Sequence, residues 1–205
     1  MKTIVKGITL ILSIVLLLTF ASCKKKEEDF SDVENPVVTM EIEGYGVIEI
    51  ELYPQIAPNT VKNFIHLIES EFYDGLTIHR VVRNFVIQGG DPKGNGTGGP
   101  GYSIKGEFSA NGFKNDLKHT QGVISMARAT PYNSAGSQFF IMLADNSNLD
   151  GQYAAFGKVT KGLDIVLEIG FVETDSKDKP VEDVIIKKVT VDTKGHKYSE
   201  PDKIK

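Results

Sequence analysis

The chain alternates apolar and polar residues over positions 37–53, VVTMEIEGYGVIEIELY, on both sides of Gly44-Tyr45-Gly46. Side chains of a strand point alternately to its two faces, so this pattern predicts a β-hairpin with one buried face. The same period returns in VEDVIIKKVTVDT, which predicts a closing strand over residues 181–193. Shorter apolar runs predict further strands over residues 78–82, 85–89, 102–108, 122–128, 137–143 and 154–159.

Two segments have a helical period instead. In APNTVKNFIHLIESEFYDG, residues 57–75, apolar side chains recur every three or four positions and share one stripe. Pro58 suits a first turn, Asn59 or Thr60 can cap it, and Gly75 lies beyond the end. Residues 163–169, after Gly162, predict a second helix. Two helices among about eight short strands predict a mainly β protein, either an antiparallel barrel or a sandwich with helices at its ends.

Length and charge narrow the class of protein. A chain of 205 residues predicts one domain with flanking segments. The net charge of −4 argues against a nucleic-acid surface, which is usually basic. The hydrophobic fraction of 40% is ordinary for a globular protein.

The first 22 residues are typical of a secretory signal peptide, with basic Lys2 and Lys6 before a short apolar stretch. The lone cysteine, Cys23, follows at once, and TFASC resembles the lipobox of bacterial lipoproteins, although Phe20 stands where leucine is usual. We expect lipidation of Cys23 and a membrane-anchored protein of the bacterial cell envelope. Lys24 favours the outer membrane. The alternative is a plain cleaved signal with an incidental cysteine.

The segments on either side of the domain are polar. Residues 23–36 carry KKKEEDFSDVENP after the cysteine, which predicts a lipid-anchored flexible tether, with a surface helix as the alternative. Residues 194–205 predict a polar C-terminal tail that is frayed.

Some motifs are too weak to carry chemistry. Gly94, Gly96 and Gly99 have the spacing of a nucleotide-binding loop, but Pro100-Gly101 follows and no helix opens there. The histidines lack the spacing of metal ligands. We therefore expect a surface loop at the glycines, no metal and no cofactor.

The stretch TIHRVVRNFVIQGGD, residues 77–91, places an arginine inside an apolar run. Arg80 and Gln88 share a face if the strand is continuous, whereas Phe85 has the opposite parity. A bend at residues 83–84 would return Phe85 to the side of Arg80. Together with Gln138 and Phe140, which share one face of a later strand, they could form one polar and aromatic surface.

Four stretches resemble the cyclophilins, a family of peptidyl-prolyl cis-trans isomerases: FYDGLTIHRVVRNFVIQGGDP, LKHTQGVISMARA, NSAGSQFFIMLA and LDGQYAAFGKV. They occur in family order, and the resemblance covers residues 37–193. It implies a closed eight-stranded antiparallel β-barrel capped by two α-helices. It also implies an enzyme that accelerates X–Pro isomerisation, here during the folding of exported proteins, with proline-containing segments as partners.

The resemblance assigns roles to ten residues. Arg80 corresponds to the catalytic arginine. The substrate-binding positions are Phe85, Val86, Gln88, Ala127, Arg128, Gln138, Phe140, Leu149 and Tyr153. Without the resemblance, a salt bridge at the end of a barrel is the commoner role for such an arginine, and Phe85 and Phe140 alone would more often be core residues.

The sequence departs from the family at several positions. Arg128 replaces the usual asparagine and adds positive charge near the groove, Val86 is smaller than the common methionine, and Tyr153 stands where many eukaryotic members have histidine. Asn148 occupies the position of a tryptophan in cyclosporin-sensitive members, so we expect weak binding of cyclosporin A.

Two other functions stay open. The groove could hold proline-containing segments as a chaperone or scaffold with incidental catalysis, or the chain could be a structural lipoprotein built on a borrowed barrel. No interface motif is visible, so we expect a monomer. The net negative charge gives the separate expectation that the protein does not bind nucleic acid.

Overall fold

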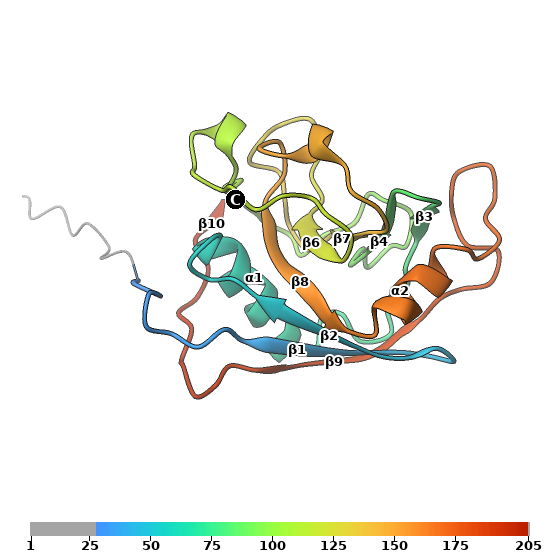
Figure 1. The fold of residues 1–205 in the computed structure, drawn as a ribbon, viewed down its shortest axis with the longest axis horizontal. Coiled ribbons are helices and arrows are strands. Elements are labelled where there is room, and N and C mark those ends of the chain that lie inside the picture. The colour runs from blue at the N-terminus through green and yellow to red at the C-terminus, as the bar shows by residue number, and fades with distance from the viewer. Residues whose placement is uncertain (1–27, 205) are drawn as a thin grey trace, which may run out of the picture.

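The computed structural model describes residues 28–204, which form one curved sheet with helices beside it (Figure 1). The strands of this sheet are β1 (Val37–Ile42), β2 (Gly46–Leu52), β3 (Arg80–Val82), β4 (Val86–Gly89), β6 (Val123–Met126), β7 (Phe139–Met142), β8 (Ala155–Lys161) and β9 (Ile186–Asp192). The remaining elements are α1 (Pro58–Glu69), α2 (Leu163–Ile169), the short strands β5 (Ser103–Ile104) and β10 (Lys203–Ile204), and the 3-10 turns η1 (Ser109–Asn111) and η2 (Ser147–Leu149).

The eight strands follow the order β3-β4-β7-β6-β8-β2-β1-β9, and the pairings within this sheet are antiparallel. One curled sheet of this kind confirms the barrel-like alternative over the sandwich. The expectation of a closed barrel was overstated, because no ladder joins β3 to β9 in the described chain. Irregular backbone spans this seam instead: Ile78 donates to the Val184 carbonyl at 2.9 Å, and a single bridge pairs Thr77 with Ile185.

The two-residue period sorts the apolar side chains into two groups. Phe139 and Ile141 of β7 enter the main core inside the curved sheet, whereas Phe140 and Met142 point to the other side. There they form a smaller cluster with Val86 and its neighbours. This second cluster underlies the candidate site.

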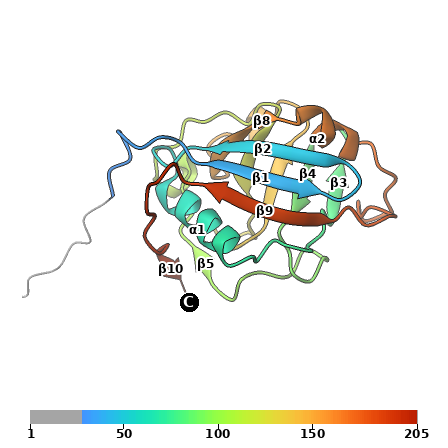
Figure 2. The ribbon, with the colours of Figure 1, turned by 90° about the horizontal axis from the view of Figure 1, so that it is seen from below.

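Helix α1 lies across one end of the sheet, and α2 lies beyond the other end of β2 and β8 (Figures 1 and 2). Both helices were expected, but the cap of α1 was not. Its N-cap residue is Ala57, whose side chain cannot accept a hydrogen bond. The buried Glu107 carboxylate accepts from the backbone N–H groups of Asn59 at 3.0 Å and Thr60 at 2.7 Å, so a distant acid caps the helix.

The polar segments at the two ends meet each other, which the sequence did not predict. Phe30 is only 4% exposed and stacks on Tyr198 with ring centroids 5.6 Å apart. Glu28 accepts from Ser199 at 3.0 Å and lies 3.6 Å from the ammonium group of Lys62 in α1. We call these contacts between residues 28–33 and 196–203 the terminal clasp. Strand β10 pairs with β5, so the tail is anchored rather than frayed.

The signal peptide, Cys23 and the first part of the tether fall outside the described residues. Within residues 28–204, neither helix has the length and apolar character that a membrane span requires.

Candidate functional site

Strands β3 and β4 form a tight hairpin that sets the positions of three predicted site residues. The chain reverses at residues 83–85, where Asn84 adopts a left-handed φ of 57° and Phe85 N–H donates to the Val82 carbonyl at 3.0 Å. The reversal places Arg80 directly opposite Gln88. The predicted bend is thus a complete turn, and Phe85 lies at its tip.

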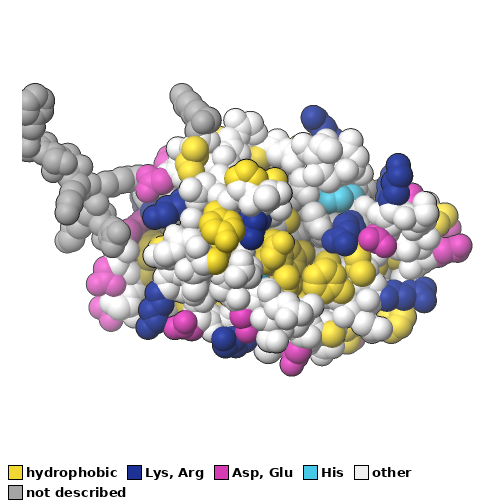
Figure 3. Space-filling model, turned by 90° about the horizontal axis from the view of Figure 1, so that it is seen from above, with side chains coloured by type: hydrophobic (Ala, Val, Ile, Leu, Met, Phe, Trp, Pro, Cys, Tyr) yellow, Lys and Arg dark blue, Asp and Glu magenta, His cyan; other side chains and the backbone are white. Residues whose placement is uncertain are grey.

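The predicted residues surround one cavity of about 200 Å³ on the outer side of the sheet. Figure 3 looks onto this side of the molecule and shows hydrophobic side chains gathered in a strip with Lys and Arg side chains nearby. Nine of the ten predicted residues line the cavity: Arg80, Phe85, Val86, Gln88, Ala127, Arg128, Phe140, Leu149 and Tyr153. The tenth, Gln138, lines a neighbouring cavity and contacts Gln88.

The floor of the cavity is apolar and rigidly packed. Phe140 is 5% exposed, and the ring of Tyr153 meets it edge-on at a centroid distance of 5.6 Å. Leu149, from η2, and Ala127, after β6, pack against the same cluster. An apolar ring could therefore enter without displacing buried polar groups.

A buried histidine supports this floor. The His119 ring stacks on Phe140 at 6.0 Å, with Nδ1 3.2 Å from Asp150 Oδ1 and Nε2 3.1 Å from Ser125 Oγ. Burial lowers the pKa of His119, so the ring is neutral at pH 7. The network then fits a tautomer in which Nδ1–H donates to Asp150 and Nε2 accepts from Ser125. From the sequence, His119 was considered only as a metal ligand and rejected. Its partners, Ser125 in β6 and the more remote Asp150, come together only in the fold.

A chain of hydrogen bonds leads from Arg80 to the glycine loop. Arg80 Nη1 donates to Gln88 Oε1 at 3.4 Å, and Gln88 Nε2 donates to Gln138 Oε1 at 2.9 Å. Gln138 Nε2 in turn donates to the carbonyls of Gly96 and Gly98 at 3.1 and 2.9 Å. The loop that resembled a nucleotide motif therefore orients the glutamines beside Arg80.

Asp91 fixes the shape of that loop. Its carboxylate accepts backbone N–H groups of Lys93 at 2.8 Å, Asn95 at 3.0 Å and Gly96. Burial on its own would raise the pKa of Asp91, but these hydrogen bonds outweigh it and lower the pKa. The residue therefore stays ionised as a loop organiser, a role that the GGD sequence did not reveal.

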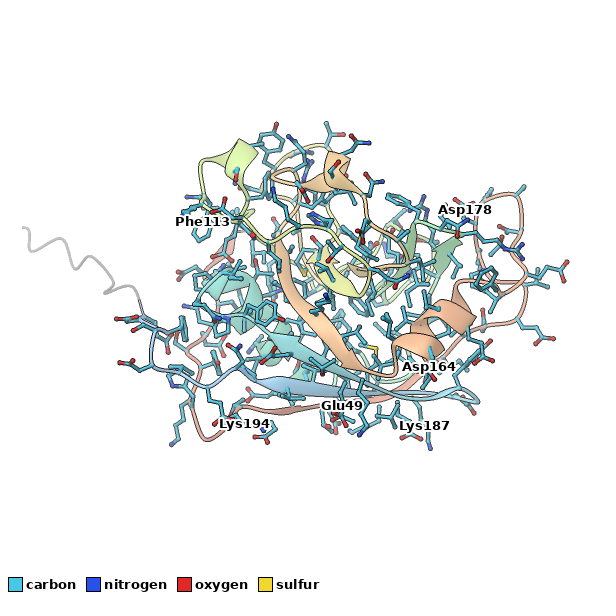
Figure 4. The ribbon with its side chains drawn as sticks, in the orientation of Figure 1. Glu49, Phe113, Asp164, Asp178, Lys187 and Lys194 are labelled. Carbon is cyan, nitrogen blue, oxygen red and sulfur yellow. The ribbon has the colours of Figure 1, made fainter. Side chains whose placement is uncertain are left out.

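Arg80 also forms a salt bridge, the alternative role that the sequence left open, with a partner that the sequence did not identify. Its Nε lies 3.5 Å from Oδ2 of Asp178, in the loop between α2 and β9. Figure 4 shows Asp178 beside β3, far from the strands at the bottom of the sheet.

Arg128 packs inward more than its expected role suggested. Its guanidinium lies 4.7–5.2 Å from the ring centroids of Phe108, Tyr132 and Tyr153. It also donates to the carbonyls of Ala129, Thr130 and Gln152. Arg128 therefore ties three loops together at the rim of the cavity.

Known proteins are similar to this chain over most of its length. The family model for cyclophilin type peptidyl-prolyl cis-trans isomerase/CLD matches residues 37–191. The chain is similar to peptidyl-prolyl cis-trans isomerase CYP18-2 of Arabidopsis thaliana, with 41% identity over 76% of this chain and 93% of the relative. It is also similar to peptidyl-prolyl cis-trans isomerase ppi1 of Schizosaccharomyces pombe, with 47% identity over 71% of this chain and 94% of the relative.

A solved structure has a similar fold. It is a cyclophilin type peptidyl-prolyl cis-trans isomerase of Cryptosporidium parvum, crystallised in the presence of the dipeptide Ala-Pro. The TM-score is 0.70 at 33% sequence identity, and the match covers 76% of this chain and 98% of that one.

Proposed function

Because the chain belongs to the cyclophilin-type peptidyl-prolyl cis-trans isomerase family, we propose that it accelerates X–Pro isomerisation in exported proteins as they fold, with Arg80 as the catalytic residue. The observation that carries this assignment is a guanidinium fixed at the rim of an apolar cavity. No bond is made or broken in the reaction, so neither a nucleophile nor a metal is required.

The chemistry follows from the amide bond. Rotation about C–N has a barrier of about 18–20 kcal/mol because resonance must be lost. In the twisted transition state the proline nitrogen regains its lone pair and becomes a better hydrogen-bond acceptor. A donor held beside that nitrogen binds the transition state more tightly than either planar ground state, which lowers the barrier. Arg80 suits this role because it stays charged and carries several donors.

The other predicted residues hold the substrate in this proposal. Phe85, Phe140 and Leu149 enclose the proline ring and exclude water, which otherwise stabilises the planar amide; Val86 and Tyr153 complete the pocket. Four residues hold the peptide backbone on either side of the ring: Gln88, Ala127, Arg128 and Gln138.

The test compares arginines in the same hairpin. Replacing Arg80 by alanine should lower kcat/KM by about 10²-fold or more, a loss of the size seen when one transition-state donor is removed. Arg80→Lys should recover only part of the rate, because lysine lacks the planar fork. Arg83→Ala is the control, since Arg83 donates to the Phe171 carbonyl outside the cavity.

The measurement is a protease-coupled isomerisation assay, with peptide binding followed by calorimetry. Equal rates for wild type and Arg80→Ala would refute the catalytic assignment. Retained peptide binding without any rate acceleration in the wild type would favour the chaperone or scaffold alternative.

We also propose that a lipid on Cys23 anchors this protein to the outer membrane as a monomer. The support is the signal-like residues 1–22, the lipobox-like TFASC and the position of the lone cysteine. Labelled fatty acid should be incorporated into the wild type and not into Cys23→Ala, and the variant should leave the membrane fraction. Labelling of Cys23→Ala at the wild-type level would refute the anchor.

A further inference from the structure

The guanidinium of Arg80 is held at two of its three nitrogens by different parts of the chain. Nη1 donates to Gln88 Oε1 at 3.4 Å, whereas Nε faces Asp178 Oδ2 at 3.5 Å. Among residues 28–204, no hydrogen bond engages Nη2. A planar group contacted at two corners has a preferred orientation, and its third corner is open to a substrate.

Asp178 owes its position to a small, well-bonded loop. The bridge between Thr174 and Pro180 closes the loop, and the Asp175 carboxylate accepts N–H groups of Lys177 and Lys179 at 2.8 and 3.0 Å. Asp178 N–H donates to the Asp175 carbonyl at 3.1 Å. The loop is therefore built from its own hydrogen bonds.

The backbone of Asp178 is strained and tied to the site. Its φ is 64°, in the left-handed region that most side chains avoid. The Asp178 carbonyl accepts a hydrogen bond from the N–H group of Val81, the residue next to Arg80, at 2.8 Å. Aspartate and asparagine adopt this region more readily than most residues. The hydrogen bond from Val81 holds the Asp178 backbone beside β3, where its carboxylate faces Arg80 Nε.

We propose that Asp178 is a positioning residue for the isomerase reaction: it orients the Arg80 guanidinium so that a free donor faces the proline nitrogen. This inference rests on the proposed catalytic role of Arg80. The side chains of Arg80 and Asp178 are 38% and 47% exposed, and ion pairs this exposed contribute little to stability. The Arg80–Asp178 ion pair therefore contributes to the orientation of the guanidinium rather than to the stability of the fold.

The central variant is Asp178→Asn. Asparagine tolerates the left-handed backbone and keeps the size of the side chain while removing its charge. We expect kcat to fall about tenfold through misorientation of the guanidinium, with KM unchanged because the apolar cavity is intact. The matched control is Asp183→Asn, which removes a charge from the same segment; Asp183 pairs with Lys179 at 3.6 Å and not with Arg80.

Salt provides a readout that a purely structural role would not change. Raising the ionic strength from 10 mM to 1 M screens exposed ion pairs. The activity of the wild type and of Asp183→Asn should fall over this range, whereas Asp178→Asn should start low and change little. The melting temperatures of all three should agree, and the Arg80 Nε–H signal in ¹⁵N spectra should shift only in Asp178→Asn.

Combining Asp178→Asn with Arg80→Ala separates this inference from the proposed function. The double variant should be no slower than Arg80→Ala alone, because Asp178 acts through Arg80. If Arg80→Ala is inactive but Asp178→Asn matches the wild type in kcat and salt response, the positioning role is overturned and the catalytic assignment survives. If Arg80→Ala retains full activity, both are overturned.

Discussion

Arg80 shows how a charged residue is accommodated in an apolar strand. Strand β3 is three residues long and lies at the edge of the sheet, so Val81 enters the core while the arginine side chain remains 38% exposed. The guanidinium keeps part of its hydration in the free protein. In the proposed function, the guanidinium would lose this hydration only when a peptide covers the cavity, and a charge-assisted hydrogen bond is stronger in such a water-excluded site.

A second residue, Asn148, bears on inhibitor binding. It is exposed in η2, next to Leu149 of the cavity, and its N–H is bonded to Asn146 Oδ1 at 3.1 Å. Where cyclosporin-sensitive relatives present an indole ring, this chain offers a small amide with little apolar area. We expect calorimetry to show weak binding of cyclosporin A, and Asn148→Trp to tighten it about tenfold.

The exposed Ser147→Trp variant in the same turn is the control, because its ring is added at a different position. A nanomolar dissociation constant for the wild type would contradict the expectation.

At the level of elements, His119 links the turn carrying Leu149 to strand β6, through Asp150 and Ser125. Because burial lowers its pKa, the unfolded chain binds this proton more tightly than the folded chain. Stability is thus fully present above the unfolded value of about 6.5 and declines as the pH falls through that value toward the lower folded pKa.

The expected outcome is a falling free energy of unfolding between pH 7 and pH 5, measured by urea denaturation. His79 is also buried with a lowered pKa and contributes in the same window. His119→Gln should therefore reduce the slope without abolishing it. An identical slope in His119→Gln would rule out this linkage.

Periodicity was enough to predict the hairpin of β1 and β2, both helices and the shared face of Arg80 and Gln88. These features depend on neighbours within a few residues. Phe85 joined that face only through the bend supposed at residues 83–84, which periodicity does not show. The supporting acids were missed because their partners are remote: Glu107 caps a helix that begins about 50 positions earlier, and Asp178 reaches back across most of the domain to Arg80. A single polar residue in a loop belongs to no periodic pattern, so the sequence does not show which remote residue it contacts.

For the whole molecule, the terminal clasp is the main departure from the expected flexible ends. Phe30 and Tyr198 are isolated aromatic residues in polar runs, but they stack on each other from opposite ends of the described chain. The contact helps to bury Phe30. The composition of each segment suggested disorder, because each segment alone has few apolar residues. Composition does not report contacts between two segments that are remote in the sequence.

Phe30→Ala should release the clasp locally. Loss of the buried ring removes about 2 kcal/mol of stabilisation from apolar burial. The tail should then become sensitive to trypsin at Lys194 and Lys197. Isomerase activity should not change, because the cavity is elsewhere. Phe171→Ala, which removes a ring that is 66% exposed, should alter neither property; resistance of Phe30→Ala to trypsin would argue against the clasp.

The order of strands also has a kinetic consequence. Val37, in the first strand of the eight-stranded sheet, pairs with Asp192 in β9, the last strand of that sheet along the chain. The sheet is therefore incomplete until nearly all of the chain is present. Contacts between such remote residues make folding slow, in the range of about milliseconds to seconds. The chain must lose the entropy of closing a long loop before the strand contacts can stabilise it. A chain that is still being synthesised or exported therefore cannot complete this sheet until β9 is free to pair with β1.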